Sequence, residues 1–229
     1  MLINLAFGKP VSSGRIFTEG ISAITPLDIQ FARELGYRIK LLAICRGSQK
    51  GVDARVHPTL IPHSHLLSQV NDTLNAVFYQ NEDTGPVMLY GRGAGMMPTA
   101  SAVVADIISL ARNMVHGIAN RVPLMPPSGK GRREITVKPI KEINTRYYLR
   151  FSAVDEPGVL SKISGILGRN HISIHSVVQQ GRRTRGGAVP IFMLTHEALE
   201  SHLQKALRQI DRLSILRDKT MLIRIEPHL

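Results

Sequence analysis

The sequence predicts an α+β protein, in which a mixed β-sheet with helices on one face is followed by a smaller β-α-β-β-α-β module. Two observations predict this class. Apolar runs with strand-like and helix-like spacing alternate at both ends of the chain, and a proline- and glycine-rich stretch separates them. A chain of 229 residues is long enough for two modest domains. We therefore expect a first domain over 1–116, a basic linker over 117–145 and a second domain over 146–229.

The composition is typical of a globular protein, with 43% hydrophobic and 20% charged residues. No apolar stretch approaches the roughly 20 residues that cross a bilayer. The apolar N-terminus has no basic region and no clean cleavage site, so we expect no signal peptide. The one cysteine, Cys45, excludes an internal disulfide and fits a reducing cytoplasm. We expect Cys45 to be a buried thiol in a strand.

The chain is strongly basic, with a net charge of +12, which favours nucleic acid or another acidic surface as one partner. The most prominent basic clusters lie among glycines, however, and are typical of solvated loops. Their residues are Lys130, Arg132 and Arg133, then Arg182, Arg183 and Arg185. A nucleic-acid-binding module is therefore kept as an alternative, which a steep salt dependence of binding would favour.

The first half begins with an apolar, glycine-rich stretch over 1–22 that shows no clear period. A helix then opens at Thr25, because Thr25 can cap it and Pro26 suits the first helical position. Asp28 lies near the positive end of the helix dipole, and Gly36 ends the helix. The expected apolar stripe consists of Ile29, Ala32 and Leu35.

Four strands follow this helix and are expected to form one sheet, mostly through hairpins. Their ranges are 37–45, 52–61, 75–80 and 86–90. Residues 63–70 are predicted to be a short helix or turn. Pro58 suggests an edge strand or a bend, because proline cannot donate to a ladder. A long helix over 99–115 carries apolar residues at helical spacing.

From residue 146 onward the pattern changes to the β-α-β-β-α-β order of a ferredoxin-like module. The expected elements are a strand 147–154, a helix from Pro157-Gly158 to Asn170, strands 172–180 and 188–195, a helix 197–211 and a strand 219–225, with a basic hairpin loop over 181–187. RNA-binding domains share this topology, but they need aromatic residues on two central strands. Here the strand 188–195 offers only Phe192, and Pro190 interrupts it, which argues against RNA.

The residues Asp155-Glu-Pro-Gly-Val-Leu, followed by a helix and then Asn170-His-Ile-Ser-Ile, closely resemble the ACT domain family of amino-acid sensors. At this loop a helix N-terminus offers N–H groups and a positive dipole to a ligand carboxylate. Gly158 allows close approach, and Asp155 could accept from an ammonium group. The resemblance implies that two modules pair with the ligand between them. The expected effector-binding residues are Asp155, Pro157, Gly158, Val159, Leu160, Ile172 and Gln179.

A structural interpretation of the same motif stays open. Asp-x-Pro-Gly is also a routine way to open a helix, and many such modules serve only to dimerise. We expect His171 and His175 to face solvent or the helix packing, and we expect no metal site.

The segment Gly91-Arg-Gly-Ala-Gly follows a strand and precedes a helix, which is the geometry of a phosphate-binding loop. The dinucleotide fingerprint requires a further glycine at position 96, where this chain has Met96. No acidic residue ends a strand about 20 residues further on. Spacing alone thus favours a tight turn, and we expect that no part of the chain binds a dinucleotide in the usual way.

The wider stretch Gly85-Pro-Val-Met-Leu-Tyr-Gly-Arg-Gly-Ala-Gly-Met-Met-Pro-Thr-Ala is far more specific and resembles the substrate domain of homoserine dehydrogenases. So do Thr18-Glu-Gly-Ile, Ile24-Thr-Pro-Leu-Asp-Ile, Val56-His-Pro-Thr-Leu-Ile-Pro and Val70-Asn-Asp-Thr-Leu-Asn-Ala-Val. In that family a C-terminal ACT domain is a common bacterial arrangement. The resemblance covers essentially the whole chain.

The resemblance implies an NAD(P)-linked oxidoreductase that interconverts L-homoserine and L-aspartate 4-semialdehyde, on the route to threonine and methionine. It also implies a homodimer, formed through the substrate domain and the ACT domain, with threonine as the leading effector and methionine or another amino acid as the alternative. Glu19 matches a residue near the substrate cleft. The cofactor-proximal positions that it implies are Gly91, Gly93, Ala94, Gly95, Pro98 and Thr99.

We expect the chain to lack the family's nucleotide-binding domain. We also expect it to lack the family's segment with acidic residues and the catalytic lysine, which would end just upstream of Met1. Lys40 lies in an apolar strand and matches no catalytic position. Hydride transfer needs a nicotinamide held against the substrate and a group that moves the proton. We therefore expect no catalytic residue in this chain and no activity of the chain alone. Two origins stay open, a truncated gene product and one half of a split enzyme, and the second implies a separate nucleotide-binding half as its partner. A stand-alone amino-acid sensor is the main alternative.

Overall fold

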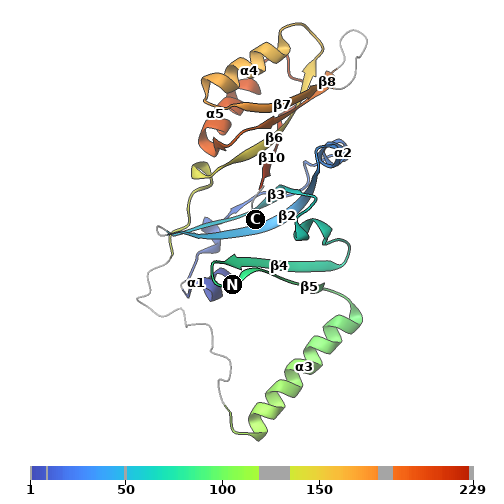
Figure 1. Ribbon diagram of the computed structural model, residues 1–229, viewed down its shortest axis with the longest axis vertical. Coiled ribbons are helices and arrows are strands. Elements are labelled where there is room, and N and C mark those ends of the chain that lie inside the picture. Colours follow the sequence, from blue (N-terminus) through green and yellow to red (C-terminus); the bar gives the residue numbers. More distant parts are fainter. Residues whose placement is uncertain (1, 9, 49–50, 119–134, 180–187, 227–229) are drawn as a thin grey trace. The chain divides into compact units, whose positions relative to one another are not determined.

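The computed structural model describes residues 2–8, 10–48, 51–118, 135–179 and 188–226 (Figure 1). The basic clusters at 130–133 and 182–185 and the expected hairpin loop 181–187 lie outside these residues. The α+β class is confirmed. The chain divides into two compact units, of which one holds Met1–Val11 and His63–Glu134 and the other holds Ser12–Pro62 and Ile135–Leu229.

The second unit is built on one eight-stranded mixed sheet. Its strands are β1 (Phe17–Thr18), β2 (Tyr37–Ser48), β3 (Gly51–Pro62), β6 (Asn144–Val154), β7 (Ile174–Gln179), β8 (Ala188–Thr195), β9 (Ala198–Leu199) and β10 (Met221–Ile225). The order is β1-β3-β10-β6-β8-β7, with β2 paired to β3 and β9 to β6. Together with α4 (Val159–Arg169) and α5 (Glu200–Ile210), the strands β6, β7, β8 and β10 form the module in the expected β-α-β-β-α-β order.

Strand β3 joins the sheet of this module to the N-terminal strands. It pairs with β2 along its whole length, and on its other edge it pairs in parallel with β1 and then with β10. Of the two alternatives for Pro58, the edge strand is wrong, because β3 pairs on both edges, and the bend stays a prediction. The β1 partners end at Val56 and the β10 partners begin at Thr59, so Pro58 lies where the ladder on that edge is interrupted.

Helix α2 (Pro26–Glu34) begins as predicted, with a capping box between Thr25 and Asp28. Asp28 is fully buried and also accepts hydrogen bonds from the Tyr148 hydroxyl at 2.9 Å and from Arg150 Nε at 2.6 Å, both on β6. Burial alone would raise the pKa of Asp28, but the hydrogen bonds from Arg150, Thr25 and Tyr148 outweigh it and lower that pKa. The first turn of α2 is thereby fixed to the module.

The sheet of the module has an apolar core on each of its two faces. On one face, α4 and α5 bury Tyr147, Leu149, Phe151, Ile163, Leu167, Leu203 and Ile210. On the other face, α2 covers Tyr148, Phe192, Leu194 and Ile223 with Phe31 and Ala32. The N-terminal region therefore completes the core of the module.

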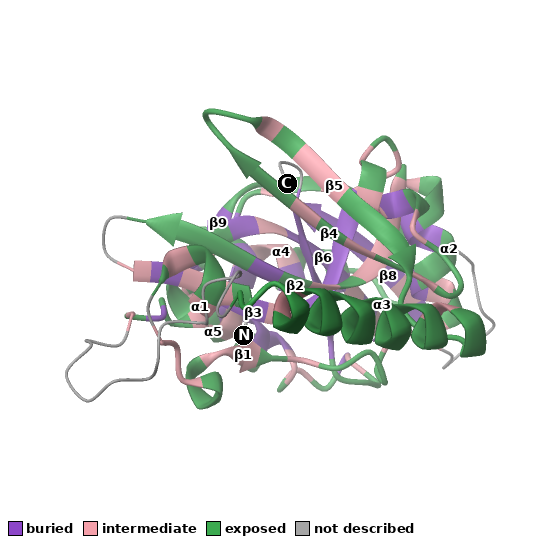
Figure 2. Cartoon of the chain, turned by 90° about the horizontal axis from the view of Figure 1, so that it is seen from below, coloured by how far each residue is buried: buried purple, intermediate pink, exposed green. Residues whose placement is uncertain are grey.

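The first unit consists of α1 (Leu2–Phe7), β4 (Leu74–Asn81), β5 (Gly85–Arg92) and α3 (Met96–Val115). The prediction of one four-stranded sheet is wrong, because β4 and β5 pair only with each other in a two-stranded sheet. Among the described residues of this unit, no apolar side chain is buried. Helix α3 in particular has no buried residue: all of its residues are exposed except the half-buried Pro98 and Asn113, and Figure 2 shows it almost entirely in the colour of exposed residues.

Three short 3₁₀ helices, η1 (Ser13–Arg15), η2 (Leu66–Gln69) and η3 (Ile140–Glu142), complete the fold. The second of them lies within the predicted helix or turn at 63–70.

The prediction that Cys45 is buried is wrong: Cys45 is exposed, whereas its neighbour Ile44 on β2 is buried. Strand alternation turns the two side chains to opposite faces. Across the described part of the chain, no helix has the length and apolarity needed to cross a membrane.

Candidate functional site

The predicted effector-binding residues lie in the loop between β6 and α4, in the first turn of α4, just before β7 and at the end of β7. Gly158 is the N-cap of α4 with a φ of 87°, in the left-handed region, and no side chain caps this helix. Asp155 and Pro157 are exposed beside it. The Gln179 side-chain amide donates to Asp155 Oδ1 at 3.4 Å. A carboxylate and an uncapped helix N-terminus thus lie on one loop, which is the pair of groups that an amino acid's ammonium and carboxylate require.

The remaining predicted effector residues differ in exposure. Leu160 is 41% exposed, whereas Val159 and Ile172 are 5% and 3% exposed and belong to the core beneath α4 and α5. A ligand at this loop would meet the side chain of Leu160 but only the backbone of the other two. His171 and His175 are exposed, as expected. Within the described ranges, no three potential ligands cluster in a way that could hold a metal ion.

The predicted cofactor-proximal residues lie in the other unit, from the end of β5 to the first turn of α3. Gly95 is the N-cap of α3 with a φ of 129°, and all of these residues except the half-buried Pro98 are exposed. A β-carbon on Gly93 would meet the end of the exposed Asn75 side chain, which would have to turn away, so the two residues pack closely in this turn. This contact agrees with the tight-turn interpretation. The uncapped start of a 20-residue helix can also receive an anionic phosphate.

Glu19 directly follows β1 and belongs to the second unit. Its backbone N–H donates to the Val56 carbonyl oxygen at 2.8 Å. Its carboxylate accepts from Arg224 Nη1 at 2.8 Å, and its side chain is 36% exposed. The backbone and the side chain of Glu19 are thus both held by hydrogen bonds, while part of the side chain stays exposed to solvent.

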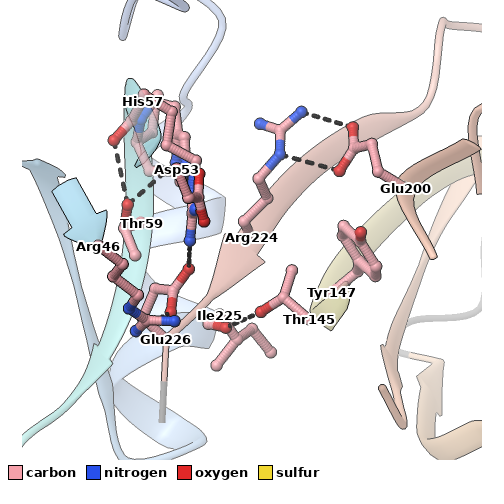
Figure 3. A network of polar contacts seen from close by, with 12 residues as sticks. Arg46, Asp53, His57, Thr59, Thr145, Tyr147, Glu200, Arg224, Ile225 and Glu226 are labelled. Atoms are coloured by element: carbon pink, nitrogen blue, oxygen red, sulfur yellow. Dashed lines mark hydrogen bonds and ion pairs between the residues drawn. The ribbon is translucent and has the colours of Figure 1, made fainter. Parts of the chain in front are cut away.

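Sequence reasoning missed a buried ionic network that runs along β3 and β10 (Figure 3). Arg224 on β10 donates to both carboxylate oxygens of Glu200, at 3.0 and 2.6 Å. Both side chains are at most 2% exposed. Burial alone would lower the pKa of Arg224, but the hydrogen bonds and charges of Glu200 and Glu19 outweigh it and raise that pKa. The guanidinium therefore stays charged in the interior.

A second cluster of the network centres on Glu226, which directly follows β10 and is 2% exposed. It accepts from Arg46 at 2.8 Å and from Arg55, which also pairs with Asp53. Arg55 is itself only 3% exposed, although it stands within a strand. Charged residues inside an otherwise apolar strand were the signal that could have revealed this network, because such residues are rarely buried without partners.

His57 lies beside this network and is fully buried. Its Nε2 accepts from Arg55 Nε at 3.1 Å, so the ring proton is on Nδ1, which lies 2.9 Å from the Pro58 carbonyl oxygen. Burial lowers the pKa of His57 to about 4, and the charges of Arg224 and Arg55 contribute in the same direction. His57 is therefore a neutral structural histidine near pH 7.

Comparison with known proteins agrees with these features. The homoserine dehydrogenase family model matches residues 1–108, and the ACT domain model matches residues 147–213. A homoserine dehydrogenase of Neisseria gonorrhoeae is 43% identical over 222 residues, which are 97% of this chain and 51% of that protein. One of Pseudomonas aeruginosa is 38% identical over 99% of this chain and 52% of its own length. The chain is a homologue of the C-terminal part of homoserine dehydrogenases.

Solved homoserine dehydrogenase structures agree with the fold. The crystal structure of a homoserine dehydrogenase from Thiobacillus denitrificans has a TM-score of 0.83 and 40% identity, covering 99% of this chain and 51% of that one. A Staphylococcus aureus homoserine dehydrogenase, at 23% identity and a TM-score of 0.64, shows the same fold. The chain thus spans about half the length of the homoserine dehydrogenases that it matches, and corresponds to their C-terminal part. Strand β10, which carries Arg224, follows the region that the ACT model matches.

Proposed function

We propose that this chain supplies the substrate-binding and regulatory part of an NAD(P)-linked homoserine dehydrogenase. Such an enzyme interconverts L-homoserine and L-aspartate 4-semialdehyde, in the synthesis of threonine and methionine. The observation that carries this proposal is the 43% identity to a homoserine dehydrogenase over 97% of the chain. The single cysteine and the biosynthetic chemistry support a cytoplasmic location.

The described residues include a turn that suits a phosphate group of a nicotinamide cofactor. The exposed turn at Gly91–Gly95, at the start of α3, offers backbone N–H groups to a phosphate. When bound, the nicotinamide would supply or accept the hydride. We propose that the turn, with Pro98 and Thr99, lies beside the cofactor in the assembled enzyme, and that Glu19 lies near the substrate. The 229 residues by themselves have no dehydrogenase activity in this proposal.

The exposed apolar surface of the first unit is evidence that a partner polypeptide binds there. Helix α3 carries a broad apolar stripe whose side chains are 45–86% exposed. Its members are Met96, Met97, Val103, Val104, Ile107, Ile108, Leu110, Met114 and Val115. A helix with such a stripe normally packs against another element. We propose that the nucleotide-binding half of the enzyme covers this stripe.

The test is a mixing experiment. The purified chain is assayed with L-homoserine and NADP or NAD, alone and with the separately expressed nucleotide-binding half of the Neisseria relative. We expect no cofactor reduction above a blank from the chain alone, and measurable reduction from the mixture. Leu110→Lys, on the apolar stripe, should prevent restoration, whereas Ser109→Lys, on the opposite side of α3, should permit it. Turnover by the chain alone, or an inactive mixture, would contradict the proposal.

The regulatory role that we propose is amino-acid sensing at the loop that holds Asp155 and Gly158. The hydrogen bond between Asp155 and Gln179 supports it, because it orients a carboxylate beside the α4 N-terminus. Threonine is the leading effector, and a homodimer formed through the substrate domain and the ACT domain is the expected assembly. Midpoints of thermal unfolding with and without L-threonine, L-methionine or D-threonine test the role. A midpoint that no L-amino acid raises would count against sensing.

The nucleic-acid alternative finds less support. RNA readers of this topology present aromatic residues of two central strands on the open face of the sheet. On that face Tyr148 and Phe192 do stand on β6 and β8, but both are buried beneath Phe31 of α2. The surface that would stack on bases is therefore occupied by the protein itself.

A further inference from the structure

Arg224 connects two parts of the second unit that the sequence assigns to different domains. It stands on β10, the last strand of the ACT module, and its register partner on the parallel strand β3 is Thr59. Its side chain is 2% exposed. Figure 3 shows the guanidinium turned toward Glu200, with β10 running between β3 and the rest of the module. The junction of the two parts thus contains a buried cation.

The three nitrogen atoms of this guanidinium are shared between two carboxylates. Nε and Nη2 donate to Glu200 at 3.0 and 2.6 Å, and Nη1 donates to Glu19 at 2.8 Å. The centroid of the Phe17 ring lies 5.0 Å from the guanidinium carbon of Arg224. A planar, bidentate cation of this kind fixes the directions of its partners as well as their distances.

The two carboxylates differ in their surroundings. Glu200 begins α5, is 1% exposed, and accepts a further hydrogen bond from the Gln204 amide at 2.9 Å. Glu19 is 36% exposed, and its backbone is fixed to β3. A shift of α5 would move Glu200, and Arg224 would have to follow, because an unpaired buried carboxylate is strongly unfavourable. The side chain of Glu19 would then lose its orientation.

We propose that Arg224 is a positioning residue that orients the Glu19 carboxylate and makes this orientation depend on Glu200 at the start of α5. The ACT module is thereby linked to a residue of the substrate-binding part. The consequence for catalysis rests on the proposed function: with Glu19 at the substrate cleft, its carboxylate suits the ammonium group of an amino-acid substrate. The linkage itself concerns only the fold of this chain.

The test observes the Glu19 carboxyl carbon directly by NMR in the 229-residue chain. Glutamate is labelled with ¹³C at the carboxyl carbon, and the Glu19 signal is assigned by its loss in Glu19→Gln. We expect Arg224→Met to shift this signal and Arg224→Lys to restore it part of the way. We also expect Glu200→Gln to shift the Glu19 signal. In this network Glu200 is connected to Glu19 only through the hydrogen bonds of Arg224, so such a shift would report the linkage.

Glu226→Gln is the matched control. Glu226 is as buried as Glu200 and also pairs with arginines, but these are Arg55 and Arg46. We expect the Glu19 signal to stay at its wild-type position in this variant. A signal that moves equally in both variants, or that does not move in Glu200→Gln, would overturn the proposal, because the effect would then be general or absent.

A second variant covers the case in which Glu200→Gln does not fold. Gln204→Leu removes one hydrogen bond from Glu200 and should produce a smaller shift of the Glu19 signal. A Glu19 signal unmoved by Gln204→Leu in a chain whose Glu200→Gln variant is unfolded also overturns the linkage. These readouts need no turnover, so failure of the dehydrogenase proposal in the mixing experiment is distinguishable from failure of this one.

Discussion

The ring of Phe31 on α2 stacks on the ring of Phe192 on β8, with centroids 3.4 Å apart and 14° between the ring planes. Both side chains are at most 2% exposed. One comes from the N-terminal region and the other from the ACT module. The loss of stability on truncating one of these rings therefore reports how strongly α2 stabilises the sheet that it covers.

Phe31→Ala should lower the free energy of unfolding by about 3–5 kcal/mol, because it opens a cavity at the centre of this face. Urea titration followed by circular dichroism measures the change. Ile29→Ala on the same helix is the control, since Ile29 is 43% exposed and its truncation should cost under about 1 kcal/mol. Equal effects of the two substitutions would mean that α2 does not rest on β8 as described.

Helix α2 also shows what a sequence can and cannot determine. Its start was predictable, because the capping box between Thr25 and Asp28 is local chemistry. Its buried face was not, because two apolar stripes are compatible with helical spacing, one through Ile29 and one through Phe31. Packing against a distant strand selects the second stripe.

The same distinction explains the sheet. The order of elements in the ACT module follows from local periodicity, and the sequence predicted it. The pairing of β10 with β3 depends on residues far apart in the chain, which no local pattern encodes. The loop of the candidate effector site was predictable from a short motif, whereas Arg224 and its partners come from three separate segments.

Gly51→Ala should lower the free energy of unfolding by about 2–4 kcal/mol. Gly51 has a φ of 142°, and an added β-carbon would collide with the Thr136 carbonyl oxygen. That oxygen accepts from the Val52 N–H at 2.8 Å, so it cannot retreat without losing a hydrogen bond. Gly20→Ala, at a position with open space, should change stability little. A fully stable Gly51→Ala variant would show that the segment at Thr136 does not pack beside β3.

Asp155→Asn should weaken binding of the L-amino acid that raises the unfolding midpoint by about tenfold or more, because it removes the charge that faces an ammonium group. Gln179→Leu should weaken it less, since Gln179 orients Asp155 through one long hydrogen bond. Isothermal titration calorimetry measures both affinities. Glu156→Gln changes a neighbouring exposed carboxylate of the same loop and is the matched control. Were all three variants to bind equally, the ligand would have to lie elsewhere.

His57 should make the protein less stable in mild acid. Its pKa is lowered from 6.5 to about 4 in the folded chain, so between these values the unfolded chain binds more protons. The stabilisation is therefore fully present above pH 6.5 and is lost as the pH falls toward 4. At about 1.4 kcal/mol per pKa unit, the free energy of unfolding should fall by about 3 kcal/mol across this window. The lowered pKa of Asp28 affects stability only below this window, because the ordinary pKa of that carboxyl is 3.8.

Urea midpoints measured at intervals from pH 7 to pH 4 would record this slope, and His57→Gln should flatten it. The variant should also be less stable at pH 7, because Arg55 Nε loses the acceptor that His57 provides. His175→Gln removes an exposed histidine and should leave the slope unchanged, which separates His57 from a general effect of histidine content. A slope that persists in His57→Gln would mean that another group takes up the proton, and the buried network around β3 would then not be the acid-sensitive part of the fold.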